Sequence, residues 1–150
     1  MKRMHLFSAL CALACAGALA APAQQDDTPG APPAAQSQNG VRYVCGGVGS
    51  DAAANLKQAA REHKLVLTFA TKTGNYLADV NVNIADARGR PLLAATCDGP
   101  IMLVDVPKDG VYRVVAEVDG KQESGKVQIG PHARGKHLAL VWPGERADQS

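Results

Sequence analysis

The spacing of apolar residues along the chain changes from a helical period to a strand period about two-fifths of the way along. Residues 50–64 form the one helical pattern. Its narrow apolar face has three residues at helical spacing, Ala53, Leu56 and Ala60. Ser50 is a favourable N-cap residue, and His63 lies in the last turn, where the helix dipole favours cations. We therefore expect a helix over 50–64 that lies on the surface of the domain, with His63 as a surface residue at its end.

Beyond this helix, apolar and polar residues alternate with a period of two, which is typical of half-buried strands. The alternation predicts seven strands, at 65–70, 80–85, 91–96, 102–106, 112–118, 122–129 and 136–142. Turn signals separate the strands, and Asp119-Gly120 is the strongest, because it favours a type I′ hairpin. Seven short strands with turns about every 8–12 residues predict an antiparallel β-sandwich.

The segments around this core are short of apolar residues. Residues 24–40 contain no large apolar side chain, so they cannot bury enough surface to offset their ordering entropy, and we expect a disordered linker. Residues 41–45 are compatible with a further short strand, and 46–49 with a glycine-rich turn. We expect the folded domain to span 41–142 and a flexible tail to follow over 143–150.

The first 23 residues have the pattern of a cleaved signal peptide. Two basic residues precede an apolar run over 6–19, and the small residues at 18–20 and 21–23 suit signal peptidase at positions −3 and −1. We therefore expect an exported bacterial protein, periplasmic or secreted.

Two alternatives to a cleaved signal depend on the same segment. A transmembrane anchor needs about 20 apolar residues, and this run is shorter. A lipoprotein would be acylated at Cys11 or Cys15, but neither follows the usual Leu-Ala-Gly type sequence, and the apolar run continues past both. We therefore expect no stable membrane insertion once the signal is removed.

Charge narrows the range of partners. The chain has 16 basic and 14 acidic residues, and cleavage after residue 23 removes Lys2 and Arg3, so the exported chain is formally neutral. Nucleic-acid-binding proteins usually carry a strong basic excess on one face. We therefore expect no nucleic-acid partner.

Cleavage also reduces the four cysteines to two, Cys45 and Cys97. An even pair in an oxidising compartment favours a disulfide, which is the prediction here. Two reduced buried thiols and a metal pair are the alternatives. Zinc usually takes four ligands at tight local spacing, and neither cysteine has a Cys or His within four residues.

The second half of the chain also carries a recognisable series of turn and core motifs. The series runs DARG at 86–89, GP at 99–100, VPKDGVYRV at 106–114 and DGK at 119–121. It resembles the carboxypeptidase regulatory-like, transthyretin-like β-sandwich family over about residues 65–142. Residues 101–102 are Ile-Met where many members carry an aromatic residue.

This resemblance implies a fold more than an activity. It implies a mainly β protein, a seven-stranded antiparallel transthyretin-like (prealbumin-like) sandwich with one short N-terminal helix. In the last strand, Leu138, Leu140 and Trp142 share one face and are best interpreted as core. The segment over 43–49 with the helix looks like small exported bacterial proteins that carry this domain alone, a group without an assigned activity.

Catalytic interpretations find little support in the residues. Hydrolases of the transthyretin-like fold end in a Tyr-Arg-Gly-Ser type sequence, whereas this chain ends RADQS. No G-x-S-x-G nucleophile elbow occurs. Related sandwiches form Lys–Asn isopeptide crosslinks beside an acidic residue, a role open to Glu117, but the strand over 136–142 offers no Asn or Asp to react. We therefore expect no catalytic residues and no cofactor, and a transthyretin-like hydrolase stays an alternative to the main hypothesis.

Two binding alternatives remain. His132 and His137 would be the ligands of a periplasmic metal-handling protein, although no third ligand is near them in sequence. Tyr76, in a loop, would be the platform of a carbohydrate-binding module, but a single ring is little for this purpose. The main hypothesis is a non-enzymatic exported binding or interaction module of the bacterial cell envelope. Its partner is an unidentified protein or envelope component.

Overall fold

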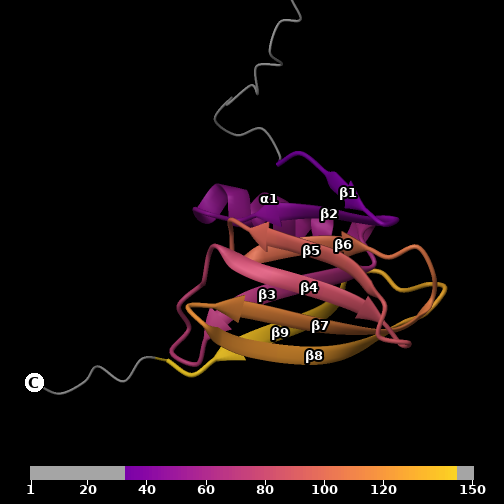
Figure 1. Cartoon of the computed structure of the whole chain (residues 1–150). Helices are drawn as coiled ribbons and strands as arrows, with labels where there is room; N and C mark the ends of the chain where they lie inside the picture. The colour runs from indigo at the N-terminus through magenta and orange to yellow at the C-terminus, as the bar shows by residue number, and fades with distance from the viewer. Residues whose placement is uncertain (1–32, 145–150) are drawn as a thin grey trace, which may run out of the picture.

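The alternating segments form two β-sheets in a computed structural model that describes residues 33–144 (Figure 1). The five-stranded sheet contains, in spatial order, β1 (Gln36–Gln38), β2 (Val41–Gly46), β6 (Ile101–Asp105), β3 (Leu65–Thr71) and β9 (Lys136–Trp142). The four-stranded sheet contains, in spatial order, β5 (Pro91–Cys97), β4 (Val80–Asp86), β7 (Gly110–Val118) and β8 (Lys121–Ile129). The signal peptide expected over 1–23 lies outside the described residues, as does most of the expected tail.

The β-sandwich class is confirmed, and the seven strands expected after the helix are present as β3 to β9. The number seven is wrong for the whole domain, because the described residues form nine strands. The expectation of a wholly antiparallel sandwich is also wrong, since β9 pairs with β3 in parallel. The reason is that side chains alternate with the same period in both kinds of pairing, so the pattern does not specify strand direction.

Order begins earlier than expected, because part of the predicted linker over 24–40 is a strand. β1 pairs antiparallel with β2, and Asn39 and Gly40 connect them with φ angles of 49° and 80°. These angles match a type I′ turn, for which Asn-Gly is a strong sequence signal. Every side chain of β1 is exposed, so backbone pairing, the turn and polar side-chain bonds hold this strand without a hydrophobic core of its own.

The helix is shorter than predicted and differs at its N-terminus. α1 (Ser50–Ala59) continues into a 3₁₀ turn, η1 (Ala60–Glu62). The expected N-cap at Ser50 is wrong, since Gly49 occupies the N-cap position and no side chain caps the helix. Leu56 is its one buried residue. It packs with residues of β2, β3 and β6, namely Val44, Val66, Ile101 and Leu103. The helix therefore covers part of the outer face of the five-stranded sheet, as expected for a surface helix.

The main core lies between the two sheets. It contains Leu65, Leu67 and Phe69 of β3, which are fully buried, with alternate residues of β4 and β7 opposite. Trp142 of β9 packs edge-to-face on Phe69 at 6.4 Å between ring centroids and donates its indole N–H to the Lys121 carbonyl. Trp142 is 2% exposed. Its predicted core position is therefore confirmed, and the last strand closes the sandwich.

A disulfide joins the two sheets, which confirms the predicted pair. Cys45 lies on β2 and Cys97 at the end of β5, with their Cα atoms 5.4 Å apart. The segments around Gly46 and Gly99 approach closely here. The evidence is that a Cβ added at Gly99 would lie 2.2 Å from the Gly46 carbonyl oxygen. The link therefore fastens the N-terminal hairpin to the four-stranded sheet.

Two amide side chains of the same hairpin reach the outer edge of β5. The Gln38 side-chain oxygen accepts a hydrogen bond from the Ala94 backbone N–H at 2.6 Å. The Asn39 side-chain nitrogen donates to the Leu92 carbonyl at 2.9 Å. In a parallel sheet, a single residue of a neighbouring strand forms the same two hydrogen bonds. Its N–H would donate to the Leu92 carbonyl, and its carbonyl would accept from the Ala94 N–H, on either side of Leu93. The β1–β2 hairpin therefore satisfies part of the β5 edge with side chains in place of a strand.

Candidate ligand-binding groove

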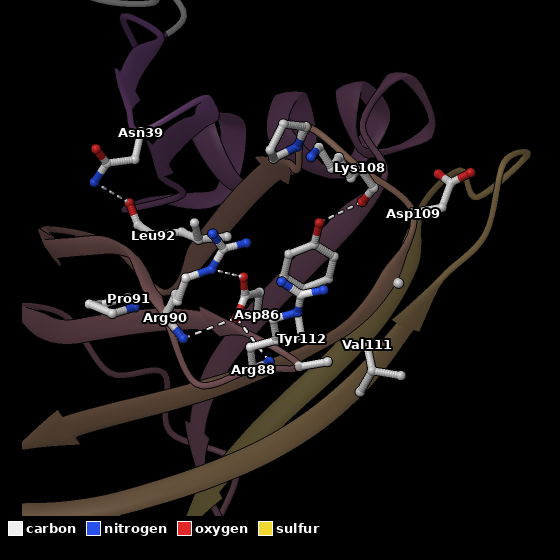
Figure 2. A pocket seen from close by; sticks show the side chains of 13 residues that line it. Asn39, Asp86, Arg88, Arg90, Pro91, Leu92, Lys108, Asp109, Val111 and Tyr112 are labelled. Atoms are coloured by element: carbon white, nitrogen blue, oxygen red, sulfur yellow. Dashed lines mark hydrogen bonds and ion pairs between the residues drawn. The ribbon is translucent and has the colours of Figure 1, made fainter.

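A groove of about 620 Å³ lies at one end of the sandwich, where three turns meet (Figure 2). One wall is the turn over 86–90 with the first residues of β5, and the other is the β6–β7 connection over 107–110. Asn39 of the β1–β2 turn lies at its edge. Small-molecule sites usually have volumes of about 300–1,000 Å³, so the groove is large enough for a small ligand or part of a larger one.

Asp86 organises the first wall. Its carboxylate accepts hydrogen bonds from the backbone N–H groups of Arg88 and Arg90, both at 3.0 Å, and from the Arg90 Nε at 2.9 Å. These bonds lower the pKa of the Asp86 carboxyl below its ordinary value, the Arg90 backbone bond contributing most. Gly89 adopts a φ of 80°, which glycine allows without strain. The Asp-x-x-Gly sequence therefore makes a turn that is held together from within.

Tyr112 fixes the second wall. Its ring is 3% exposed, and its hydroxyl donates to the Lys108 carbonyl four residues upstream. Burial raises the pKa of the Tyr112 hydroxyl, so the group is neutral and acts as a donor at ordinary pH. A buried tyrosine that bonds to an upstream carbonyl is the arrangement of the tyrosine corner of β-sandwich domains. Its role here is to hold the turn over 107–110 against the start of β7.

Charged groups surround the groove, and the two acids among them have partners. Figure 2 shows the Arg90 side chain beside the Asp86 carboxylate and facing the Tyr112 side of the groove. Asp109 lies 3.5 Å from the Lys64 Nζ, and in Figure 2 its carboxylate points away from Arg90. The groove therefore presents positively charged nitrogen atoms more than free carboxylates.

The two histidines of the metal-handling alternative lie apart from this groove, and the described residues add no third ligand to them. His132 is exposed in the turn before β9, and the His137 Nε2 lies 2.8 Å from the Thr68 hydroxyl on the outer face of the five-stranded sheet. Within residues 33–144, no group of three or more His, Cys, Asp or Glu side chains is placed to hold a metal ion. The His137–Thr68 contact is accounted for by the parallel pairing of β9 with β3.

The other singled-out residues have local contacts. Tyr76 is 56% exposed, and the Lys57 Nζ lies 5.8 Å from its ring centroid, so this ring packs beside α1. Glu117 accepts a hydrogen bond at 3.0 Å from Gln122, which is its cross-strand partner in the β7–β8 hairpin. Both residues lie outside the groove.

His63 is less exposed than the sequence suggested. Its side chain is 16% exposed, and its Nδ1 lies 2.7 Å from the Asp105 carboxylate at the end of β6. Asp105 also accepts the Lys64 backbone N–H at 2.9 Å. The expectation of a plain surface residue is therefore wrong. Asp105 is a polar residue at the end of an apolar strand, and its contacts with His63 and Lys64 connect the end of the helical segment to the sheet.

Comparisons with known proteins add no relative. A scan against protein-family models gives no match, and a search of curated proteins finds no significant match either. The structure itself defines the class: a β-sandwich of five-stranded and four-stranded sheets, joined by one disulfide, with a groove at one end. No helix in the described range, 33–144, is long and apolar enough to cross a membrane.

Proposed function

We propose that this protein is a non-enzymatic binding or interaction module of the bacterial cell envelope, exported to the periplasm or secreted. The groove between the turns over 86–90 and 107–110 carries the proposal. Hydrogen bonds of Asp86 and Tyr112 hold both walls in place. A site that is already formed loses little conformational freedom when a ligand binds, so a rigid groove favours recognition.

The state of the polar groups in the groove supports binding more than catalysis. The Asp86 carboxylate is occupied by three hydrogen bonds, and the Tyr112 hydroxyl donates to a backbone carbonyl. General acid–base catalysis needs a group within hydrogen-bond reach of the substrate with a pKa near the working pH. The causes acting on Asp86 and Tyr112 move their pKa values away from neutrality.

Export and fold family are part of the same proposal. The Cys45–Cys97 disulfide supports export, because disulfides persist in oxidising compartments. A transthyretin-like origin of the sandwich is supported by the motifs at 86–89 and 106–114, which form the two turns that face each other across the groove. The formal neutrality of the chain after removal of residues 1–23 supports an absence of nucleic-acid partners.

The proposal is tested by titrating the protein with material from the compartment in which it is proposed to act. The full chain is expressed in a bacterium, labelled with ¹⁵N and purified from the periplasmic fraction, which also tests the removal of residues 1–23. Solubilised envelope extract is then added while backbone amide signals are recorded. We expect the shifted amides to cluster at 86–92 and 107–112.

A blocked groove and a matched control make this test specific. Ala87→Trp places a bulky ring on the groove wall, whereas Ala139→Trp places the same ring on the exposed outer face of β9. The proposal predicts that the first substitution abolishes the response to the extract and the second preserves it. An extract that shifts no amide of the unsubstituted protein, or that shifts amides only away from the groove, would contradict the proposal.

A further inference from the structure

The charged side chains that line the groove include more cations than acids. Three are cationic, Arg88, Arg90 and Lys108, and two are acidic, Asp86 and Asp109. They come from two turns that are far apart in sequence, so the fold rather than a local run of basic residues brings the cations together. The character of the groove depends on which of these charges are already paired within the protein.

The two acids are the paired ones. Asp86 accepts three hydrogen bonds within its own turn, and the one from the Arg90 Nε, at 2.9 Å, is also an ion pair. Asp109 has the Lys64 ammonium 3.5 Å away, outside the groove. In Figure 2 the Asp109 carboxylate is directed away from the space between Arg90 and Tyr112. Each acid therefore has a cationic partner, Asp86 within its own turn and Asp109 outside the groove.

The cations form fewer ion pairs and hydrogen bonds within the protein than the acids do. Within residues 33–144, the Arg88 guanidinium and the Lys108 ammonium form no ion pair and no hydrogen bond, and both residues are exposed. Arg90 uses its Nε on Asp86, which leaves the two terminal nitrogen atoms of its guanidinium. The Asp86 bond also orients Arg90, so less side-chain freedom is lost when its remaining donors bind a ligand.

Apolar atoms complete the lining. Pro91 and Leu92 lie beside Arg90, and Pro107 and Val111 lie on the opposite wall. Val111 is 40% exposed, which is high for a valine in a strand of this sandwich. A groove with a cationic centre and apolar edges suits a ligand that carries an oxyanion on a partly apolar body.

We propose that the groove binds an oxyanion, the carboxylate or phosphate group of a larger ligand, through Arg88, Arg90 and Lys108. Guanidinium groups bind carboxylate and phosphate oxygens through two parallel N–H donors, and the ammonium adds a third positive group. This inference rests on the proposed function and names the chemical class of its ligand.

The test uses defined probes in place of envelope extract. The ¹⁵N-labelled full chain is titrated at low ionic strength with N-acetyl-alanyl-alanine, with the same dipeptide as its C-terminal amide, and with inorganic phosphate. We expect the free acid to shift the amides of 86–90 and 108–111, and the neutral amide to leave them unchanged. Phosphate shifting the same amides would assign the site to oxyanions generally, and a response to the acid alone would assign it to carboxylates.

Two double variants of equal charge separate a site from general electrostatic attraction. Arg88→Gln with Lys108→Gln removes two charges from the groove, and Lys121→Gln with Lys126→Gln removes two from exposed positions of β8. Since a hydrogen bond to a charged group contributes about 1.5–3 kcal/mol, the groove variant should bind the effective probe about tenfold more weakly or worse. The β8 variant should bind within about twofold of the unsubstituted protein, because its lost charges lie outside the groove.

The outcomes separate this inference from the proposed function. Equal weakening in both double variants, or no groove response to any probe, overturns the oxyanion site. If envelope extract still shifts the groove amides in that case, the binding function stands with a different ligand class. A groove response to the acid without any response to extract supports the oxyanion site and overturns the envelope function.

Discussion

Removal of the Cys45–Cys97 disulfide should cost a large part of the stability of the domain. The perturbation is the double substitution Cys45→Ala with Cys97→Ala, compared with the unsubstituted protein in its oxidised and reduced forms. The bond joins β2 of one sheet to β5 of the other across 52 residues of sequence. Without it, the unfolded chain gains the conformational freedom that the closed loop denies it.

The loop length sets the expected magnitude. In the chain-entropy description, a closed loop of this size stabilises the folded state by about 4 kcal/mol. Cys97 is fully buried in the main core, so its truncation removes packing worth about 1 kcal/mol in addition. We therefore expect the double variant to lose about 5 kcal/mol from an unfolding free energy that is usually about 5–15 kcal/mol for a whole domain. The corresponding fall in Tm is about 20 °C, at about 4 °C for each kcal/mol.

The sole tryptophan makes the measurement direct. Trp142 is buried in the core, so its fluorescence reports unfolding in urea. Oxidised protein, protein reduced with dithiothreitol and the double variant are unfolded under identical conditions. The reduced protein retains both sulfur atoms and isolates the effect of the covalent link, and the double variant adds the loss of packing at Cys97.

Two results would refute this reasoning. A difference below about 1 kcal/mol between oxidised and reduced protein would mean that the loop entropy is not a main source of stability. A double variant much less stable than the reduced protein would mean that packing at Cys97 outweighs the link. A reduced protein about 4 kcal/mol less stable than the oxidised one, and close to the double variant, would support it.

Three further predictions concern single side chains. Tyr112→Phe should lower the unfolding free energy by about 1–3 kcal/mol, because the Lys108 carbonyl loses its donor. Tyr43→Phe loses a bond to an exposed side chain, so it should lower the unfolding free energy less. Equal losses in urea unfolding would contradict this difference. Gly99→Ala should prevent or severely weaken folding, since its Cβ would lie 2.2 Å from a β2 carbonyl oxygen. Gly130→Ala is the control, because a Cβ there would lie in open space. Thermal melts followed by circular dichroism compare the two variants, and similar melts would disprove the close approach. Because the pKa of Asp86 is lowered in the folded state, its stabilising effect is present above its ordinary pKa of 3.8 and is lost as pH falls through the lower folded value. Asp86→Asn should therefore flatten the acid limb of the curve of stability against pH. An unchanged acid limb would contradict the assignment.

Local patterns were sufficient for the strands from β3 to β9 and for the disulfide, because each depends on features close in sequence or on composition. The β7–β8 hairpin is an example, since Asp119 and Gly120 adopt φ angles of 50° and 73°, as a type I′ turn requires. The same signal is present in Asn39-Gly40, but the polar residues around it predict a linker. Turn chemistry there outweighs the lack of apolar residues.

The groove could not be predicted in the same way. Its walls come from the segments over 86–92 and 107–112, and the positions of these walls depend on how β4, β5 and β7 pair. The turn motifs at 86–89 and 106–114 contain Asp86 and Tyr112, but the motifs do not show that these residues face a common space. The parallel pairing of β9 with β3 is a similar case, because strand direction depends on the path of the whole chain.

The amides of Gln38 and Asn39 on β5 have a consequence for self-association. β5 has the sequence PLLAATC, without a charged residue, and an uncharged edge strand is a template on which strands of other molecules assemble. The hairpin amides occupy two of the backbone positions that such a strand would need at Leu92 and Ala94. The β1 strand, whose side chains are all exposed, and the turn that follows it therefore block part of the β5 edge to a strand from another molecule.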